Sequence, residues 1–183
     1  VYIGCYDNNL YALDAKNGQF LWKYATEGGI ATRPAAVDEA VFVGSEDFRV
    51  HALNTTNGRL IWTCYTEGPI RSSPTLSHGH LFLGSDDNHL HVVNILSGRR
   101  AWRADAAGPV RSSPLISNER VYFGCETGDF YCVDFRGELK WRFKAKRGIT
   151  SSPLLVEGMI YFTSLDWTLY AIEAEGGWQI WRC

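Results

Sequence analysis

Two pairs of histidines have the spacing of a metal site built on a β-strand. His78 and His80 are two residues apart, and so are His89 and His91. Alternate residues of a strand point to the same side, so each pair could offer two imidazole nitrogens to a divalent transition metal. The first pair, however, lies in the turn before an apolar run, and the second begins in the turn after that run. Successive turns of an up-and-down sheet lie at opposite ends of its strands, so the pairs cannot combine into one four-ligand site and the sequence predicts no metal site.

The five cysteines offer neither a redox motif nor a disulfide framework. Their number is odd, and no two of them stand in a Cys-x-x-Cys or Cys-Cys arrangement. Cys5 and Cys125 fall where equivalent segments of the chain carry serine, as at Ser45 and Ser85, which indicates small packed residues. Free thiols persist in a reducing compartment, and we expect the cytoplasm rather than the periplasm.

Charge and hydropathy argue against two broad classes of function. The 18 basic and 20 acidic residues give a net charge of −2, so no bulk positive field is available to hold nucleic acid. A basic strip runs along residues 140–146. We favour the interpretation that these charges protect an exposed edge strand from pairing with another chain. The alternative is that the strip binds an anionic partner. No stretch approaches eighteen consecutive apolar residues, so the sequence predicts no membrane span.

The elements that must position any site are internal repeats. Equivalent apolar runs begin at Val1, Val41, Leu81, Val121 and Ile160, so the period is 40 residues, shortened by one in the fourth repeat. The repeats therefore span residues 1–40, 41–80, 81–120, 121–159 and 160–183 and are expected to form one domain.

Each repeat contains the same succession of short strands. One apolar run leads through a polar turn, usually with an aspartate, into a second apolar run. A turn with a glycine then precedes a strand with a tryptophan, and a glycine-containing corner leads into Ser-Ser-Pro and a last short strand. Four strands bounded by Gly, Asn, Asp or Pro match one blade of a propeller. We therefore predict an all-β chain, a β-propeller of about five four-stranded antiparallel blades with strands A to D from the axis outwards.

The segment from Ala12 to Trp22 carries a recognisable motif. It reads Ala-Leu-Asp-Ala-Lys-Asn-Gly-Gln-Phe-Leu-Trp and resembles A-x-D-x-x-x-G-x-x-x-W, the tryptophan-docking motif of the pyrroloquinoline-quinone-like (quinoprotein-type) β-propeller repeat family. The motif recurs more loosely in every repeat, so the resemblance covers essentially the whole chain. It implies that five tryptophans are structural and pack against the neighbouring blade: Trp22, Trp62, Trp102, Trp141 and Trp181.

The resemblance implies a fold that several functional classes share. Quinone-dependent alcohol or sugar dehydrogenases, outer-membrane-assembly scaffolds and sensor or regulatory domains of multidomain bacterial proteins all use this repeat. The dehydrogenases share an adjacent cysteine pair, a calcium site and a catalytic aspartate. This sequence contains no Cys-Cys pair, and no set of its residues can be matched to the calcium ligands. We therefore expect a non-catalytic binding or scaffold propeller without a cofactor, such as the sensor domain of a bacterial protein. A dehydrogenase fragment and an assembly scaffold stay open as alternatives.

Strand order predicts which turns form a binding face. The B–C turns and the D–A corners lie on the same side of a propeller, and that side gathers aspartates, arginines and large aromatics, the usual anchors of recognition. The aspartates could instead cap their own turns, and the aromatics could pack across a seam between blades. The sequence does not distinguish a protein partner from a small-molecule ligand. The candidate partner-binding residues are Arg33, Arg71, Arg111, Asp47, Asp87, Asp166, Phe48 and Trp167.

The first repeat begins directly in strand B, so its inner strand A is missing. We therefore expect one strand fewer than five complete blades would have, with residues 1–4 as an apolar edge facing the axis. Closed rings avoid such edges, so we expect the chain to belong to a larger ring, of about seven or eight blades, in a longer protein. Self-association that covers the edge is the second possibility.

Overall fold

Nineteen strands and no helix make up the structure, a computed structural model that describes every residue from 1 to 183. No segment is therefore a helix long and apolar enough to cross a membrane. The strands form five antiparallel sheets, four of them with four strands and the first with three. This confirms the predicted propeller architecture, including the missing inner strand of the first blade.

Strands of one blade follow one another in the sequence, so short turns join them. The first two blades contain β1 (Tyr2–Gly4), β2 (Asn9–Leu13) and β3 (Phe20–Ala25), then β4 (Ala35–Val37), β5 (Ala40–Gly44), β6 (Arg49–Asn54) and β7 (Leu60–Tyr65). The third contains β8 (Thr75–Ser77), β9 (His80–Ser85), β10 (His89–Asn94) and β11 (Arg100–Asp105). The last two contain β12 (Leu115–Ser117), β13 (Arg120–Gly124), β14 (Asp129–Asp134) and β15 (Leu139–Lys144), then β16 (Leu154–Val156), β17 (Met159–Ser164), β18 (Thr168–Glu173) and β19 (Gln179–Arg182).

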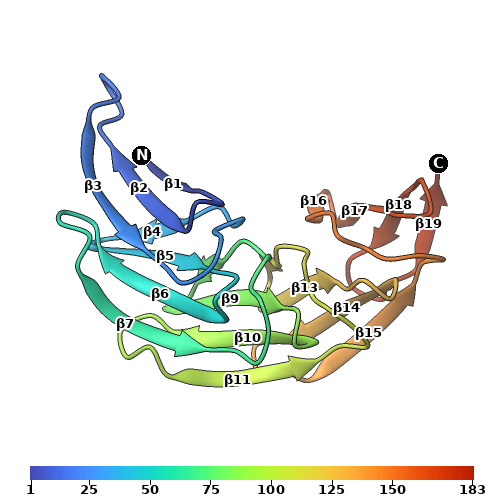
Figure 1. Ribbon diagram of the computed structural model, residues 1–183. Helices are drawn as coiled ribbons and strands as arrows, with labels where there is room; N and C mark the ends of the chain where they lie inside the picture. The colour runs from blue at the N-terminus through green and yellow to red at the C-terminus, as the bar shows by residue number, and fades with distance from the viewer.

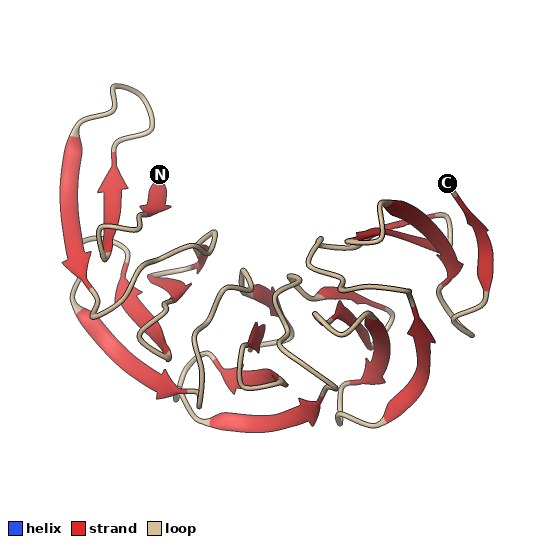
Figure 2. Ribbon diagram, turned by 45° about the vertical axis from the view of Figure 1, so that its right-hand side comes forward, coloured by secondary structure: helices blue, strands red, loops and turns tan.

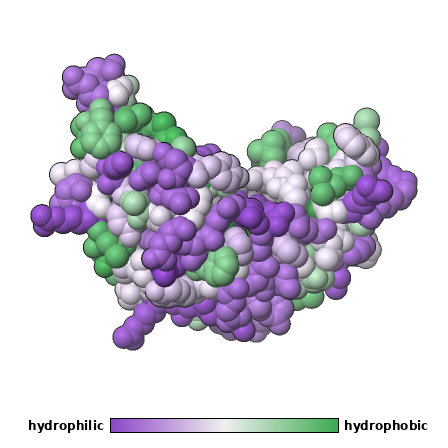
Figure 3. Space-filling view, viewed as in Figure 1, coloured by the Kyte–Doolittle hydropathy of each residue, from purple (hydrophilic) through white to green (hydrophobic).

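The blades stand side by side in an open arc whose two tips carry the chain termini (Figure 1). The short A strands β4, β8, β12 and β16 lie on the concave side, and the long D strands run along the convex rim (Figure 2). In the first blade β1 is the concave edge. Exposed apolar side chains gather on this blade, among them Val1, Ile3, Phe20 and Leu21. Figure 3 shows hydrophobic residues on the arm that carries this blade.

The hydrophobic core lies in the seams between blades. Strand β5 buries four consecutive residues because both of its faces are covered by neighbouring blades, which explains its continuous apolar run. Alternate side chains enter opposite seams. Val41 and Val43 pack with Leu10 of the first blade, whereas Phe42 packs with Leu81 of the third.

Four of the five motif tryptophans contact a glycine of the following blade. A Cβ atom added to Gly98 would lie 2.6 Å from Cδ2 of Trp62. Trp22, Trp102 and Trp141 have the same relation to Gly58, Gly137 and Gly177. The indole nitrogens of Trp22, Trp62 and Trp141 also donate to backbone carbonyls of the next blade, at 2.9–3.1 Å, on Thr55, Ile95 and Ala174. Trp181, in the last blade, is 40% exposed.

The repeated Ser-Ser-Pro segments join the blades along the concave side. The backbone N–H of Ser73 donates to Oγ of Ser113, and the N–H of Ser113 donates to Oγ of Ser152. Arg33 begins this series, because its N–H donates to Oγ of Ser73 at 2.9 Å. The second serine of each segment is thus an acceptor for the preceding blade, a role that a hydroxyl can fill and an apolar side chain cannot.

Candidate partner-binding face

Backbone hydrogen bonds fix each D–A corner to the B–C turn that follows it. The N–H of Glu46 donates to the Gly29 carbonyl at 2.9 Å, and the N–H of Asp86 donates to the Pro69 carbonyl at 2.9 Å. The fourth and fifth blades repeat this bond. The two sets of segments therefore form one continuous face, as strand order predicts.

The candidate aspartates of this face are turned inwards. Asp47 accepts a hydrogen bond from Nε2 of His51 at 2.9 Å, and Asp87 from Nε2 of His91 at 2.8 Å. Asp166 accepts one from the Tyr170 hydroxyl at 2.7 Å. Each also caps its own turn through the backbone N–H two residues later.

The same three carboxylates hold neighbouring blades together. Each accepts a hydrogen bond from a backbone N–H of the preceding corner, donated by Glu27, Glu67 and Lys146 at 3.2, 2.9 and 3.3 Å. The side chains of Asp47 and Asp87 are only 2% and 3% exposed. With their oxygens engaged and buried, these two aspartates contribute to the seams and offer no accessible contact to a partner.

Acid should weaken these seams. Burial by itself would raise the pKa of the Asp47 and Asp87 carboxyls, but hydrogen bonds from His51, His91 and backbone N–H groups outweigh it and hold both pKa values below the usual range. Such carboxyls stabilise the fold fully above the pKa of the unfolded chain, about 3.9, and lose that contribution as the pH falls. We expect the free energy of unfolding to drop between about pH 5 and pH 2, by on the order of 1 kcal/mol per carboxyl. Urea denaturation would measure the drop, which should be smaller in Asp47→Asn/Asp87→Asn; an equal drop in both proteins would contradict this origin.

Two candidate arginines belong to a chain of ion pairs across three blades. Nε of Arg71 lies 2.7 Å from Oε1 of Glu46, and its Nη1 contacts the Asp86 carboxylate. Arg111 in turn contacts Asp86 through Nε at 2.8 Å and Glu126 through Nη1. Both guanidinium side chains are about one-third exposed, at 34% and 33%. They present a fixed charge pattern to solvent and are not free cations.

The arginines were predictable as candidates from the sequence, whereas their acidic partners, Glu46, Asp86 and Glu126, were not among the predicted residues. A signal was present, because these acids occupy one turn position in the second, third and fourth repeats. The first and fifth repeats have Tyr6 and Leu165 there, with exposed fractions of 70% and 54%. The face is therefore charged in the middle blades and apolar at the two outer blades.

Phe48 and Trp167 lie at the same turn position and have a left-handed backbone. Their φ angles are 69° and 67°, and the equivalent residues of the other three blades, Asn8, Asn88 and Gly128, also have positive φ. Trp167 is 95% exposed and Phe48 is 43% exposed. Neither ring is stacked on another aromatic ring.

Arg33 and the basic strip complete the candidate cations. Arg33 is exposed at the concave side, next to the hydroxyls of Ser73 and Ser113, and makes no ion pair. The strip on β15 is paired within its own blade: Arg142 and Lys144 contact the buried Asp129, and Lys140 contacts Asp134. Of the three candidate arginines, Arg33 alone is both exposed and unpaired; Lys146, at the end of the strip, is also exposed and makes no ion pair.

Three solved structures share this fold over the whole chain. BamB from Moraxella catarrhalis matches with a TM-score of 0.90 at 18% identity, the computationally designed Ika8 protein with 0.88 at 16%, and Sqt1 from Saccharomyces cerevisiae with 0.87 at 15%. Each match covers 100% of this chain and 57% of the other, so the chain spans little more than half the length of these proteins. Likeness at such low identity shows the fold alone.

Sequence comparison adds the family. Among curated proteins none matches the sequence. A family profile described as outer membrane protein assembly factor BamB matches residues 6–129 and 107–182, and so almost the whole chain. Together with the five blades and the repeated docking motif, this match confirms the resemblance drawn from the motif: the chain belongs to the family of pyrroloquinoline-quinone-like β-propellers described as outer membrane protein assembly factor BamB.

Proposed function

We propose that this chain is a non-catalytic scaffold that binds protein partners through the face of its B–C turns and D–A corners. The family match supports this role, because the description of the family names a protein assembly factor. An outer-membrane role would place the chain in the cell envelope rather than in the cytoplasm that its cysteines favoured. Cys125 and Cys132 are fully buried, which protects their thiols from oxidation in either compartment.

The observation that carries the proposal is the exposed Trp167 at a positive φ angle. A left-handed backbone costs a residue with a bulky side chain about 1 kcal/mol or more, whereas asparagine and glycine adopt it readily. Within these five blades Trp167 recovers none of this cost through packing, because 95% of it is exposed. Local strain without a structural benefit is typical of functional positions, and tryptophan is enriched among the residues that dominate binding at protein interfaces.

The polar groups of the face support binding rather than catalysis. A general base or nucleophile needs a side chain that can reach a substrate. The carboxylates of Asp47 and Asp87 are buried in seam contacts, and Arg71 and Arg111 neutralise acids in fixed ion pairs. Accessible aromatic and apolar groups, Tyr6, Phe48, Leu165 and Trp167, are what this face offers to a partner.

Replacing Trp167 with asparagine should separate binding from stability. We expect Trp167→Asn and Phe48→Asn to lose cross-linked protein partners from an envelope extract of the source cells, measured by mass spectrometry against the wild-type chain. Their melting temperatures should stay equal to that of the wild type or rise, because asparagine relieves the backbone strain.

A matched control is available on the opposite face. Trp178 is 73% exposed in the turn between β18 and β19, and the first blade has Gln19 at the same position. Trp178→Gln should therefore keep the wild-type set of partners. If Trp167→Asn captured that same set with equal yield, partner binding by the B–C face would be rejected.

A further inference from the structure

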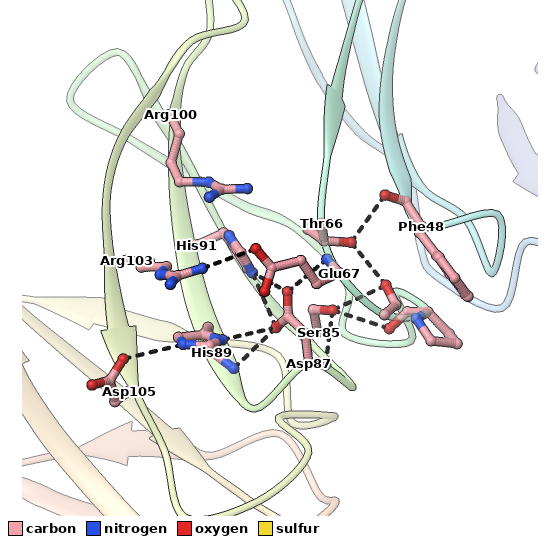
Figure 4. Close-up of polar contacts among 12 residues, drawn as sticks. Phe48, Thr66, Glu67, Ser85, Asp87, His89, His91, Arg100, Arg103 and Asp105 are labelled. Carbon is pink, nitrogen blue, oxygen red and sulfur yellow. Dashed lines mark hydrogen bonds and ion pairs between the residues drawn. The ribbon is translucent and has the colours of Figure 1, made fainter.

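Asp87, His89 and His91 come together at the start of β10. Residues two apart on a strand point to the same side, and one donor atom from each of the three side chains lies within 4.8 Å of the other two. Both imidazole rings point toward the Asp87 carboxylate (Figure 4). The two histidine pairs lie on opposite faces, and it is Asp87, two residues before His89, that adds a third potential ligand to the second pair.

The distances within this cluster suit a metal ion with three protein ligands. Nε2 of His91 lies 2.8 Å from Oδ2 of Asp87, and Nδ1 of His89 lies 3.4 Å from Oδ1. Ligand atoms of a tetrahedral zinc ion are about 3.3 Å apart, because each is about 2.0 Å from the metal. Small side-chain shifts would therefore place all three donors around one ion, provided that the proton of His91 moves from Nε2, which donates to Asp87 in the metal-free chain, to the unpartnered Nδ1.

His89 is held as a metal ligand would be held. Its Nε2 lies 3.1 Å from Oδ1 of Asp105, an acceptor that fixes the proton on Nε2 and leaves the lone pair on Nδ1. That Nδ1 atom is buried, has no hydrogen-bond partner and faces the carboxylate of Asp87. A lone pair directed at a carboxylate is unfavourable unless a positive charge, either a metal ion or a proton on Nδ1, lies between them.

The surrounding charges also favour a divalent cation. Glu67 is neutralised by Arg103, whose Nη1 lies 3.3 Å from Oε1. Imidazoles bind metal in their neutral form, so a divalent cation would balance the carboxylates of Asp87 and Asp105 beside them. The backbone N–H of Glu67 donates to Oδ2 of Asp87 at 2.9 Å and holds the carboxylate in position, as outer contacts of metal ligands do.

Comparison with the other blades identifies His89 as the residue that the fold does not require. The second blade has the same buried pair, Asp47 and His51, but carries Arg49 between them. Arg49 is itself paired, with Glu27. The first and fifth blades have Asn9 and Thr168 at this position. A second imidazole beside the Asp–His pair therefore occurs in the third blade alone.

We propose that Asp87, His89 and His91 bind one divalent transition metal ion, with Zn²⁺ as the best match and water at the remaining position. Two imidazoles and one carboxylate suit zinc and neighbouring first-row metals, whereas Ca²⁺ and Mg²⁺ prefer oxygen ligands. The ion would fix the β9–β10 turn, which belongs to the B–C face. The site does not depend on partner binding and stands or falls separately from it.

Zinc titration of the metal-free chain by calorimetry tests this site. We expect one Zn²⁺ per chain, and Co²⁺ bound at the same site should give the visible absorption bands of a four-coordinate ion. His89→Asn should weaken zinc binding at least about 100-fold because it removes one of three ligands. Asp105→Asn should weaken it by about 10-fold, because it removes the partner that orients His89.

The other histidine pair provides the control. His78→Asn/His80→Asn removes two imidazoles from the opposite face and should leave zinc affinity unchanged. Metal-free His89→Asn should keep the wild-type melting temperature, because Asn9 fills this position in the first blade. The site is overturned if the wild-type chain binds no stoichiometric zinc, if His89→Asn binds as tightly as the wild type, or if binding is lost in the His78/His80 variant.

Discussion

Replacement of Trp62 by alanine should lower the free energy of unfolding by about 3–5 kcal/mol. The indole ring lies against Gly98 of the next blade and 5.6 Å, between ring centroids, from Phe42 of its own blade. Its Nε1 donates to the Ile95 carbonyl at 2.9 Å. Alanine would open a cavity in this seam and leave the carbonyl without that donor, and both effects act in the folded state. Urea denaturation followed by circular dichroism would measure the loss.

Two other tryptophan substitutions serve as controls for the expected loss in Trp62→Ala. Trp178→Ala removes the same side chain from a position that is 73% exposed and should change the free energy of unfolding by no more than about 0.5 kcal/mol. Trp62→Phe keeps a ring but removes the hydrogen bond, so it should cost about 1 kcal/mol more than Trp102→Phe, where the indole nitrogen makes no hydrogen bond. Equal losses in Trp62→Ala and Trp178→Ala would show that the ring does not contribute to the seam.

The fold was predictable because one strand pattern is repeated along the chain. A single run such as Val41-Phe42-Val43 is ambiguous, since a buried helix segment is also apolar. Its recurrence at a 40-residue period, each time between the same turns, removes the ambiguity. The first repeat begins directly in strand B, and this predicted the three-stranded first blade.

The position of the candidate face was predictable from the sequence, but the hydrogen-bond partners of its side chains were not. Asp47 and Asp87 are in turns on the predicted side, yet their carboxylates close on His51 and His91, four residues later. That spacing was visible in the sequence, but the N–H donors from the preceding corners come from another blade and depend on how blades stack. Side chains that cross a seam follow tertiary geometry, which one repeat considered alone does not contain.

The exposure and backbone strain of the turn aromatics could not be predicted from the sequence. Large aromatics at turn positions marked Phe48 and Trp167 as unusual, and packing across a seam was an equal alternative. Trp167, in the last of the five blades, is 95% exposed at a φ of 67°, so no seam within these five blades packs against it. Phe48 is partly covered, with 43% exposed.

The glycine that receives the docking tryptophan should be as sensitive as the tryptophan itself. Gly98 has a φ of +67°, and a Cβ atom there would lie 2.6 Å from Cδ2 and 2.7 Å from Cγ of Trp62. Gly98→Ala should therefore combine left-handed strain of about 1 kcal/mol with an overpacking cost of about 1–3 kcal/mol. Equilibrium urea denaturation should show a total loss of about 2–4 kcal/mol.

Gly79 separates these two contributions to the loss at Gly98. Its φ is +72°, nearly the same, but an added Cβ would meet nothing within 4 Å. The fourth blade has Glu119 at the equivalent turn position with a φ of 58°, so a side chain is sterically accepted there. Gly79→Ala should thus cost about 1 kcal/mol, the strain alone.

A double-mutant cycle then tests the contact directly. In a Trp62→Ala background the clash at residue 98 is absent, so adding Gly98→Ala should cost about 1 kcal/mol instead of about 2–4 kcal/mol. Coupling of this size is expected only for residues in contact, and Gly79→Ala should show none with Trp62→Ala. If Gly98→Ala and Gly79→Ala cost the same in the wild-type background, the ring of Trp62 does not press on this glycine. In that case the motif's glycine would serve its own turn and not the seam between the blades.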